Sequence, residues 1–291
     1  MTISSRLTTL TSIRTRLAIA GTLTTDDTFL DTLIDEASAW FFEQTRERAF
    51  VPYQDTRQLR RDALGEPAVS RWGRYIAPSI IVDEDLLAVQ SITNGDSDAS
   101  TVDAYTLLPL NSYPKERVEL TSASGSAWNF ESYDSAVSIT GFWGFHPDYT
   151  HAWESASSLA ATLSASDTAA VVPSVSAYED GDYVLIGGSE IGRVTGAAAG
   201  TLTLLRGQNG TTAGTHAIAE TVKPYRFLND VQNAVDNLVK YYYHHRKSDD
   251  VAQIVDVGVR LESKVPPDVW NVAERYKKSD FRATGGEWYE W

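Results

Sequence analysis

The chain contains no cysteine among its 291 residues. Disulfide bonds, thiolate zinc sites and cysteine nucleophiles are therefore excluded. No stretch approaches the roughly 20 apolar residues that a membrane helix needs, and the N-terminal segment MTISSRLTTL lacks the apolar run of a signal peptide. These absences predict a soluble protein that is made in a cytoplasm and does not contact a membrane.

Clusters of basic residues are also missing. The net charge is −14, and residues 61–147 alone hold five basic and 12 acidic side chains. Tight binding to a nucleic-acid backbone needs clustered Lys and Arg. We therefore expect the chain to repel DNA that passes close to it rather than to bind it.

The sequence carries no catalytic signature of a known kind, such as HExxH, GxSxG, a P-loop or GxGxxG. The adjacent His244 and His245 would point about 100° apart on a helix and cannot chelate a metal as an i, i+4 pair does. The acidic run Asp83-Glu84-Asp85 has no recognisable pocket around it for acid–base catalysis. We expect no enzymatic activity, no cofactor and no metal.

What is present is an ordinary globular composition, with 42% apolar and 22% charged residues. Eight Trp and 14 Tyr exceed what such a core usually needs. Core or strand-face positions would explain many of them, and protein–protein interfaces also favour these side chains. Both interpretations remain open for any single aromatic residue.

Amphipathic helical patterns occupy both ends of the chain. At the N-terminal end, residues 4–20 and residues 26–47 have apolar residues spaced by three or four, and Thr24-Thr25-Asp26-Asp27 is a capping cluster before the second pattern. At the C-terminal end, helix is predicted from Asn229 with a break at Asp249-Asp250, and a last helix starts at Pro266-Pro267.

The sequence pattern in the middle of the chain predicts β-structure. Short apolar runs at 80–82 and 86–89 are followed by strand-like segments at 105–109, 118–120 and 137–145. Residues 54–74 are rich in Arg, which indicates an extended connector or hairpin. Residues 155–172 are rich in Ala, Ser and Thr and lead into three short strands with turns at Gly187-Gly188 and near Gly200.

Two segments together resemble the head–tail connector (adaptor, or head-completion) proteins of long-tailed bacteriophages. The first is the helix from Asp27 to Ala37, which runs into Trp40-Phe41-Phe42-Glu43-Gln44-Thr45. The second comprises Ile92-Thr93-Asn94-Gly95, Tyr105 to Pro109, and Ile139-Thr140-Gly141-Phe142-Trp143-Gly144. Residues 182–216, including Glu190, Arg206-Gly207-Gln208-Asn209-Gly210 and His216, look like a small β-module that recurs in phage virion proteins.

The resemblance implies an α+β fold in which N- and C-terminal segments form a discontinuous helical bundle. The expected parts are a helical adaptor domain (1–60 and 228–278), a β-rich extension (61–153), an inserted β-barrel-like module (160–226) and a C-terminal docking tail (279–291). The implied function is a homo-oligomeric ring, a dodecamer, which is assembled in the host cytoplasm and located in the virion neck. It would join the portal protein to a tail, stopper or tail-terminator protein and continue the DNA channel for genome ejection.

Three sets of residues are predicted to serve this role. Portal docking is assigned to the tail aromatics Trp288, Tyr289 and Trp291. Bundle and subunit packing is assigned to Phe29, Leu33, Trp40, Phe41, Val235, Leu238 and Tyr242. The acids proposed for the channel lumen are Asp83, Glu84 and Asp85. Alternative functions are another virion part, such as a stopper, tail-tube or baseplate component, and a carbohydrate-binding or glycosidase-like β-protein.

Overall fold

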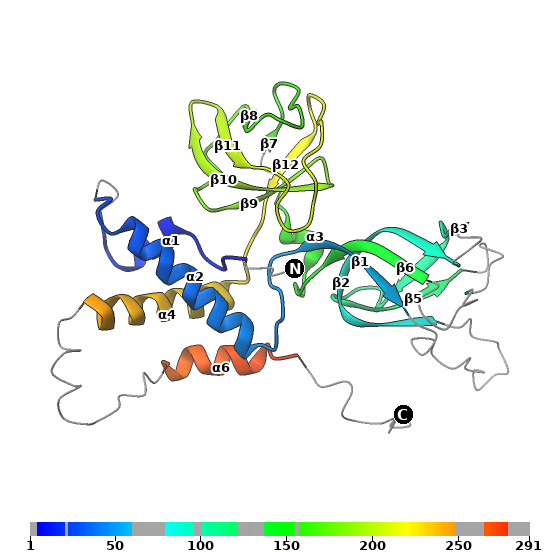
Figure 1. Cartoon of the computed structure of the whole chain (residues 1–291), viewed down its shortest axis with the longest axis horizontal. Coiled ribbons are helices and arrows are strands. Elements are labelled where there is room, and N and C mark those ends of the chain that lie inside the picture. Colours follow the sequence, from blue (N-terminus) through cyan, green and yellow to red (C-terminus); the bar gives the residue numbers. More distant parts are fainter. Residues whose placement is uncertain are drawn as a thin grey trace. The chain divides into compact units, whose positions relative to one another are not determined.

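The protein is an α+β chain with helices and two antiparallel sheets (Figure 1). It divides into two compact units, one formed by Met1–Phe50 with Trp153–Trp291 and the other by Val51–Ala152. The computed structural model describes residues 5–20, 23–59, 79–95, 100–121, 128, 137–154, 157–247 and 265–278.

Four helices of the first unit come from the two ends of the chain: α1 (Leu10–Arg16), α2 (Asp27–Gln44), α4 (Asn229–Lys247) and α6 (Pro267–Arg275). Phe29 of α2 contacts Tyr243 of α4 with ring centroids 6.1 Å apart, and Trp40 of α2 lies 5.7 Å from Trp270 of α6. The buried side chains recur every three or four residues, on α2 at Leu30, Leu33, Ile34, Ala37 and Phe41 and on α4 at Val231, Val235, Leu238 and Val239. Each buried Leu or Phe contributes about 1.5–3 kcal/mol.

The ends of α1 and α2 differ from the predicted ones. The first helix begins at Leu10 rather than near Ser4, because Thr9 is extended and its hydroxyl accepts from Ser12 N. Asp26 occupies the N-cap position of α2 without a side-chain cap, and its carboxylate accepts instead from Tyr243 Oη at 2.7 Å. The helix ends at Gln44, ahead of Arg46 and Glu47, which both have a φ of 58°.

The unit Val51–Ala152 contains the sheet β1-β6-β2-β5-β4, with β3 paired to β2. Its core includes Ile80, Leu86, Ile92, Val118 and Ile139, all of which are fully buried. Its elements are β1 (Tyr53–Leu59), β2 (Ser79–Asn94), β3 (Ser100–Thr101), β4 (Tyr105–Leu108), β5 (Lys115–Leu120), β6 (Val137–Trp143) and the short helix α3 (Tyr149–Ala152).

The structure refines two predictions for this unit. In the segment 54–74, predicted as an extended connector or hairpin, the described residues up to Leu59 are extended and belong to strand β1, which pairs with β6 along its whole length. Residues 60–74 lie outside the described residues. The apolar runs 80–82 and 86–89, both predicted to be strand-like, lie in the single long strand β2. Its register with β5 shifts between Ile81 and Leu86, and it pairs with β6 from Leu86 onward. A strand with bulges loses the strict alternation on which a sequence-based assignment depends.

The second sheet belongs to the first unit and has the order β7-β12-β9-β10-β11-β8. The sheet is curled (Figure 1). Backbone hydrogen bonds outside the strands support this curvature: Ala160 N donates to Val171 O, and Leu163 and His216 each donate their N–H to the other's carbonyl oxygen. Positive φ angles at Gly187-Gly188 and Ala199-Gly200 make the two tight turns, which confirms the predicted turn positions. The strands are β7 (Ser157–Ser158), β8 (Ala169–Val171), β9 (Tyr183–Ile186), β10 (Glu190–Ala198), β11 (Thr201–Leu205) and β12 (Thr221–Pro224).

Candidate functional site

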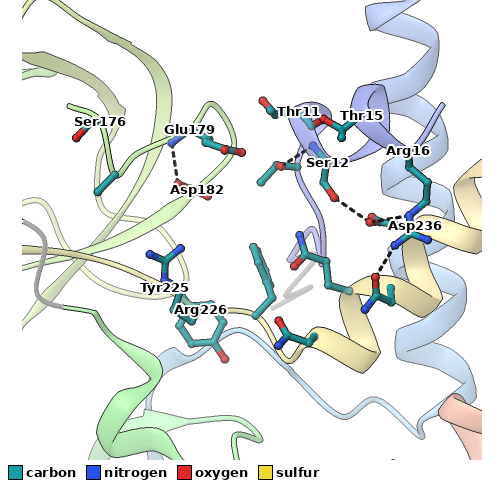
Figure 2. Close-up of a pocket in the computed structure, with 16 residues that line it drawn as sticks. Thr11, Ser12, Thr15, Arg16, Ser176, Glu179, Asp182, Tyr225, Arg226 and Asp236 are labelled. Carbon is teal, nitrogen blue, oxygen red and sulfur yellow. Dashed lines mark hydrogen bonds and ion pairs between the residues drawn. The ribbon is translucent and has the colours of Figure 1, made fainter. Parts of the chain in front are cut away.

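A cavity of about 700 Å³ lies within the first unit, between helices α1 and α4 and the loops of the second sheet (Figure 2). Most of its lining side chains carry hydroxyl, amide or charged groups. They are Thr9, Thr11, Ser12, Thr15, Arg16, Ser176, Ala177, Glu179, Asp182, Tyr225, Arg226, Phe227, Asn229, Gln232, Asn233 and Asp236.

The helical wall is centred on a polar stripe of α4. Asn229, Gln232, Asn233 and Asp236 are spaced at i, i+3, i+4 and i+7, so they share one helix face. Asp236 is buried. Its carboxylate accepts hydrogen bonds from the hydroxyls of Thr8 and Ser12, the latter at 2.8 Å.

Arg16 of α1 joins this stripe and neutralises it. Its Nε lies 3.3 Å from Asp236 Oδ2. Its two terminal nitrogens donate to the amide oxygens of Asn237, at 2.9 Å, and Asn233. The charges on the helical side are thus paired, and the remaining groups are amides and hydroxyls.

The opposite wall comes from the loop before β9 and from the chain after β12. Burial raises the pKa of Asp182 to about 6, although its carboxylate accepts a 2.8 Å hydrogen bond from Glu179 N. Arg226 forms an ion pair with Glu154. Phe227 packs edge-on against Tyr225, with ring centroids 5.5 Å apart, and presents an aromatic surface to the cavity.

A second, buried polar cluster joins the start of β10 to the chain that follows β11. Glu190, Arg206 and His216 have side chains that are 1%, 6% and 5% exposed. Glu190 accepts from Arg206 Nε at 2.6 Å, Arg206 Nη2 at 2.7 Å, Gly207 N at 3.0 Å, Gly214 N at 2.9 Å and His216 Nε2 at 2.9 Å. Burial raises the pKa of this carboxyl, but these hydrogen bonds outweigh burial and lower it to about 2.

The partners of Arg206 and His216 complete this cluster. Arg206 Nη1 donates to the carbonyls of Ser164 and Asp167, and Nη2 also donates to Gly214 O at 2.7 Å. His216 Nδ1 lies 2.8 Å from Glu220. All five N–H groups of the guanidinium are therefore satisfied, and we assign the cluster to holding the loops of the sheet together.

Neither group of residues forms a recognisable catalytic centre. The carboxylates of the cavity are next to amides and hydroxyls, with no imidazole among the lining residues. Within the described ranges there is no group of three or more His, Asp or Glu side chains arranged to hold a metal ion. What this geometry provides is an array of hydrogen-bond donors and acceptors.

The residues predicted for packing lie on helices α2 and α4. Leu33, Phe41, Val235 and Leu238 are buried in the helical core, whereas Phe29, Trp40 and Tyr242 are half-buried. The neighbouring Tyr243 is the tyrosine that packs on Phe29 and bonds to Asp26.

The predicted lumen acids lie on β2. Glu84 accepts from Arg57 Nη2 at 2.9 Å and from Tyr53 Oη at 3.3 Å, so its charge is partly paired. Asp85 is half-buried, and nothing is described of the Asp83 side chain. Trp288, Tyr289 and Trp291 lie outside the described residues.

Sequence reasoning missed the cavity and the buried cluster. The sequence contained a signal for the polar stripe of α4, because Asn229, Gln232 and Asn233 recur at helical spacing opposite the apolar stripe. The pairing of Glu190 with Arg206 and His216 was not readable, since it depends on how three separate segments meet.

Comparison of the chain with family models, with curated proteins and with solved structures finds no match. No helix in the described part of the chain has both the length and the hydropathy to cross a membrane.

Proposed function

We propose that this protein is a structural virion component, a head–tail connector that forms a ring between the portal vertex and the tail. The observation that carries the proposal is the packing of helices from the two ends of the chain, α1 and α2 with α4 and α6. In the sequence, the β-structure lies between helices that pack together in the fold. We expect this arrangement in a structural protein whose function is to bind neighbouring subunits.

The finer architecture is part of this proposal. The predicted boundary at residue 60 moves to residue 50, because β1 (Tyr53–Leu59) pairs with β6 in the unit Val51–Ala152. In this proposal residues 1–50 and 228–278 make the discontinuous helical adaptor domain and the unit Val51–Ala152 is the β-rich extension. The inserted module, predicted as residues 160–226, also takes in β7 (Ser157–Ser158), which pairs with β12. Support comes from long-range contacts in the helical part, such as the hydrogen bond from Tyr243 to Asp26 and the one at 3.2 Å from Lys278 N to Thr45 O. The self-contained core of the curled sheet, with Val184, Ile186, Val194 and Leu202, supports the module.

In the ring, each subunit offers one surface to the next and a different surface to the previous one, and the contacts close by rotation. The aromatic residues Phe29, Trp40 and Tyr242 are half-buried on the helices and supply such contact area, since aromatic side chains dominate interface hot spots. Portal binding is assigned to the tail residues Trp288, Tyr289 and Trp291.

The acidic balance of the chain suits a DNA channel. With a net charge of −14, a lumen lined by carboxylates lets the duplex slide without specific binding. Asp83, Glu84 and Asp85 are the proposed lumen acids. Because Glu84 pairs with Arg57, the net negative charge of this acidic run is smaller than that of three unpaired carboxylates.

Electron microscopy of the purified protein, alone and mixed with the portal protein of the same phage, tests the proposal. The expected result is closed rings that co-sediment with portal. A stopper, tail-tube or baseplate component would join tail proteins and leave portal unbound. Monomers with no affinity for any virion protein would overturn the proposal and its virion alternatives together.

A further inference from the structure

The amide stripe of α4 has hydrogen-bonding capacity that the fold does not use. The side chains of Asn229 and Gln232 make no hydrogen bond to another described residue, and Asn233 uses only its amide oxygen, for Arg16. Each carboxamide combines a donor NH2 group with an acceptor oxygen. A row of such groups along one helix face is complementary to a ligand that also alternates donors and acceptors.

The charges around the cavity disfavour an anionic ligand. Arg16 is paired with Asp236 and Arg226 with Glu154. The carboxylates of Glu179 and Asp182, by contrast, form no ion pair with a described cationic side chain, and Arg226 acts on Asp182 only from a longer distance. A phosphate or sulfate group entering this cavity would be repelled by these two carboxylates, neither of which is held in an ion pair.

The size and the aromatic content of the cavity narrow the choice further. About 700 Å³ falls within the range of small-molecule sites. Most of the lining is polar, with Phe227 and the largely buried Tyr225 as its aromatic members. Vicinal hydroxyls match amide and carboxylate groups, and the C–H face of a sugar ring packs on an aromatic side chain.

We propose that this cavity binds a neutral oligosaccharide through Asn229, Gln232 and Asn233 on one side and Asp182 and Phe227 on the other. A peptide is a poorer match, because peptide recognition uses pockets for successive side chains and this lining is hydroxyl and amide. The inference goes beyond the connector role and does not depend on it.

The test starts from a glycan array printed with neutral, sialylated and sulfated oligosaccharides and probed with the full chain. The strongest neutral oligosaccharide is then titrated by isothermal calorimetry at low and high salt. The expected result is selective binding to neutral glycans with an affinity that salt leaves unchanged, because no ion pair forms.

Variants locate the binding. Gln232→Ala and Asn229→Ala are each expected to weaken binding by about 5- to 10-fold, the effect of one lost neutral hydrogen bond. Gln232→Glu keeps the side-chain shape and removes the amide donor, so it serves if an alanine variant misfolds. Gln58→Ala removes an exposed amide from strand β1 in the other unit and should leave binding unchanged.

Three outcomes would overturn the inference. They are the absence of binding to any neutral glycan, a preference for acidic glycans or for a peptide library over neutral sugars, and neutral binding that the folded Gln232→Glu and Asn229→Ala variants leave intact. Circular dichroism and the Tm of each variant establish that it is folded.

Discussion

Glu190 illustrates how a buried charge is stabilised at the scale of one residue. Its side chain is 1% exposed, and an unpaired charge there would be strongly unfavourable. Two backbone N–H groups, one guanidinium and one imidazole nitrogen compensate for the lost hydration. Because these donors come from separate loops, the carboxylate ties those loops to β10.

Glu190→Gln should therefore destabilise the sheet. The substitution leaves Arg206 buried without its counter-charge and turns an NH2 group toward other donors, which costs about 3 kcal/mol at pH 7. Urea unfolding followed by circular dichroism measures this loss. Glu179→Gln, at an exposed position, is the matched control and should change stability by less than about 0.5 kcal/mol. Equal stability of the two variants would contradict the assigned role.

The same carboxylate predicts an acid limit of stability. The pKa of Glu190 is lowered in the folded state from 4.5 to about 2, so the unfolded chain binds the proton first as pH falls. The stabilisation is complete above pH 4.5 and is lost between about pH 4.5 and 2, with a magnitude on the order of 3 kcal/mol. Unfolding free energies of wild type and Glu190→Gln should converge across this window.

Asp182 has the opposite sign. Burial raises its pKa from 3.8 to about 6, so the folded chain binds the extra proton and stability falls as pH rises from about 4 to 6. Asp182→Asn should therefore stabilise the protein by about 1–2 kcal/mol at pH 7 and have no effect below pH 4. Thermal unfolding at both pH values tests this. Glu116→Gln, at an exposed position of β5 in the other unit, is the control, and a destabilised Asp182→Asn at pH 7 would contradict the prediction.

At the scale of elements, the pairing of β6 with β2 depends on a glycine. A Cβ on Gly141 would lie 2.2 Å from the carbonyl oxygen of Ala88, a backbone atom in the bulged part of β2. Gly141→Ala should destabilise the unit Val51–Ala152 by about 3 kcal/mol, because neither strand can move away without breaking the ladder.

A second strand glycine provides the control for this prediction. A Cβ on Gly196 would meet nothing closer than Thr203 Oγ1 at 3.7 Å. Gly196→Ala should be neutral or slightly stabilising, because alanine restricts the unfolded chain. The Tm of each variant measures its stability. Equal changes in Tm for the two variants would mean that the strands at Gly141 can move apart easily, which would contradict the prediction.

At the scale of the whole molecule, the proposed parts predict how the chain tolerates deletion. Replacing residues 160–226 by a short linker should leave the helical part folded, because the curled sheet has its own core. Circular dichroism and cooperative thermal unfolding of the deletion variant are the measurements. The contacts from Arg6 N to Tyr183 Oη and from Tyr225 Oη to Phe50 O would be lost, so some reduction of Tm is expected. Global unfolding would show that the sheet is integral to the unit.

The C-terminal residues make a separate prediction. A chain truncated after Thr284 should stay folded and lose portal binding, because it lacks Trp288, Tyr289 and Trp291 and a hot-spot side chain contributes about 2 kcal/mol or more. Co-sedimentation with portal measures this loss. The matched control is the full-length chain with the substitutions Glu287→Gln and Glu290→Gln, which keeps the three aromatic residues and should keep portal binding. Full portal binding by the truncated chain would remove the docking role.

The sequence by itself determined the local structure. Apolar residues at helical spacing, such as Leu30, Leu33 and Ile34, predict α2, and paired glycines at 187–188 predict a tight turn. These depend on the preferences of neighbouring residues along the chain. The helical ends of the chain and the β-rich middle were readable for the same reason.

Only the tertiary structure decided which distant residues meet. Glu190, Arg206 and His216 were visible as part of one segment, but their shared hydrogen bonds depend on how β10 and two loops fold over each other. The cavity takes Ser12, Asp182 and Gln232 from three separate segments. Its polarity is a property of the packed surfaces, because one chain segment cannot specify what another segment brings to face it.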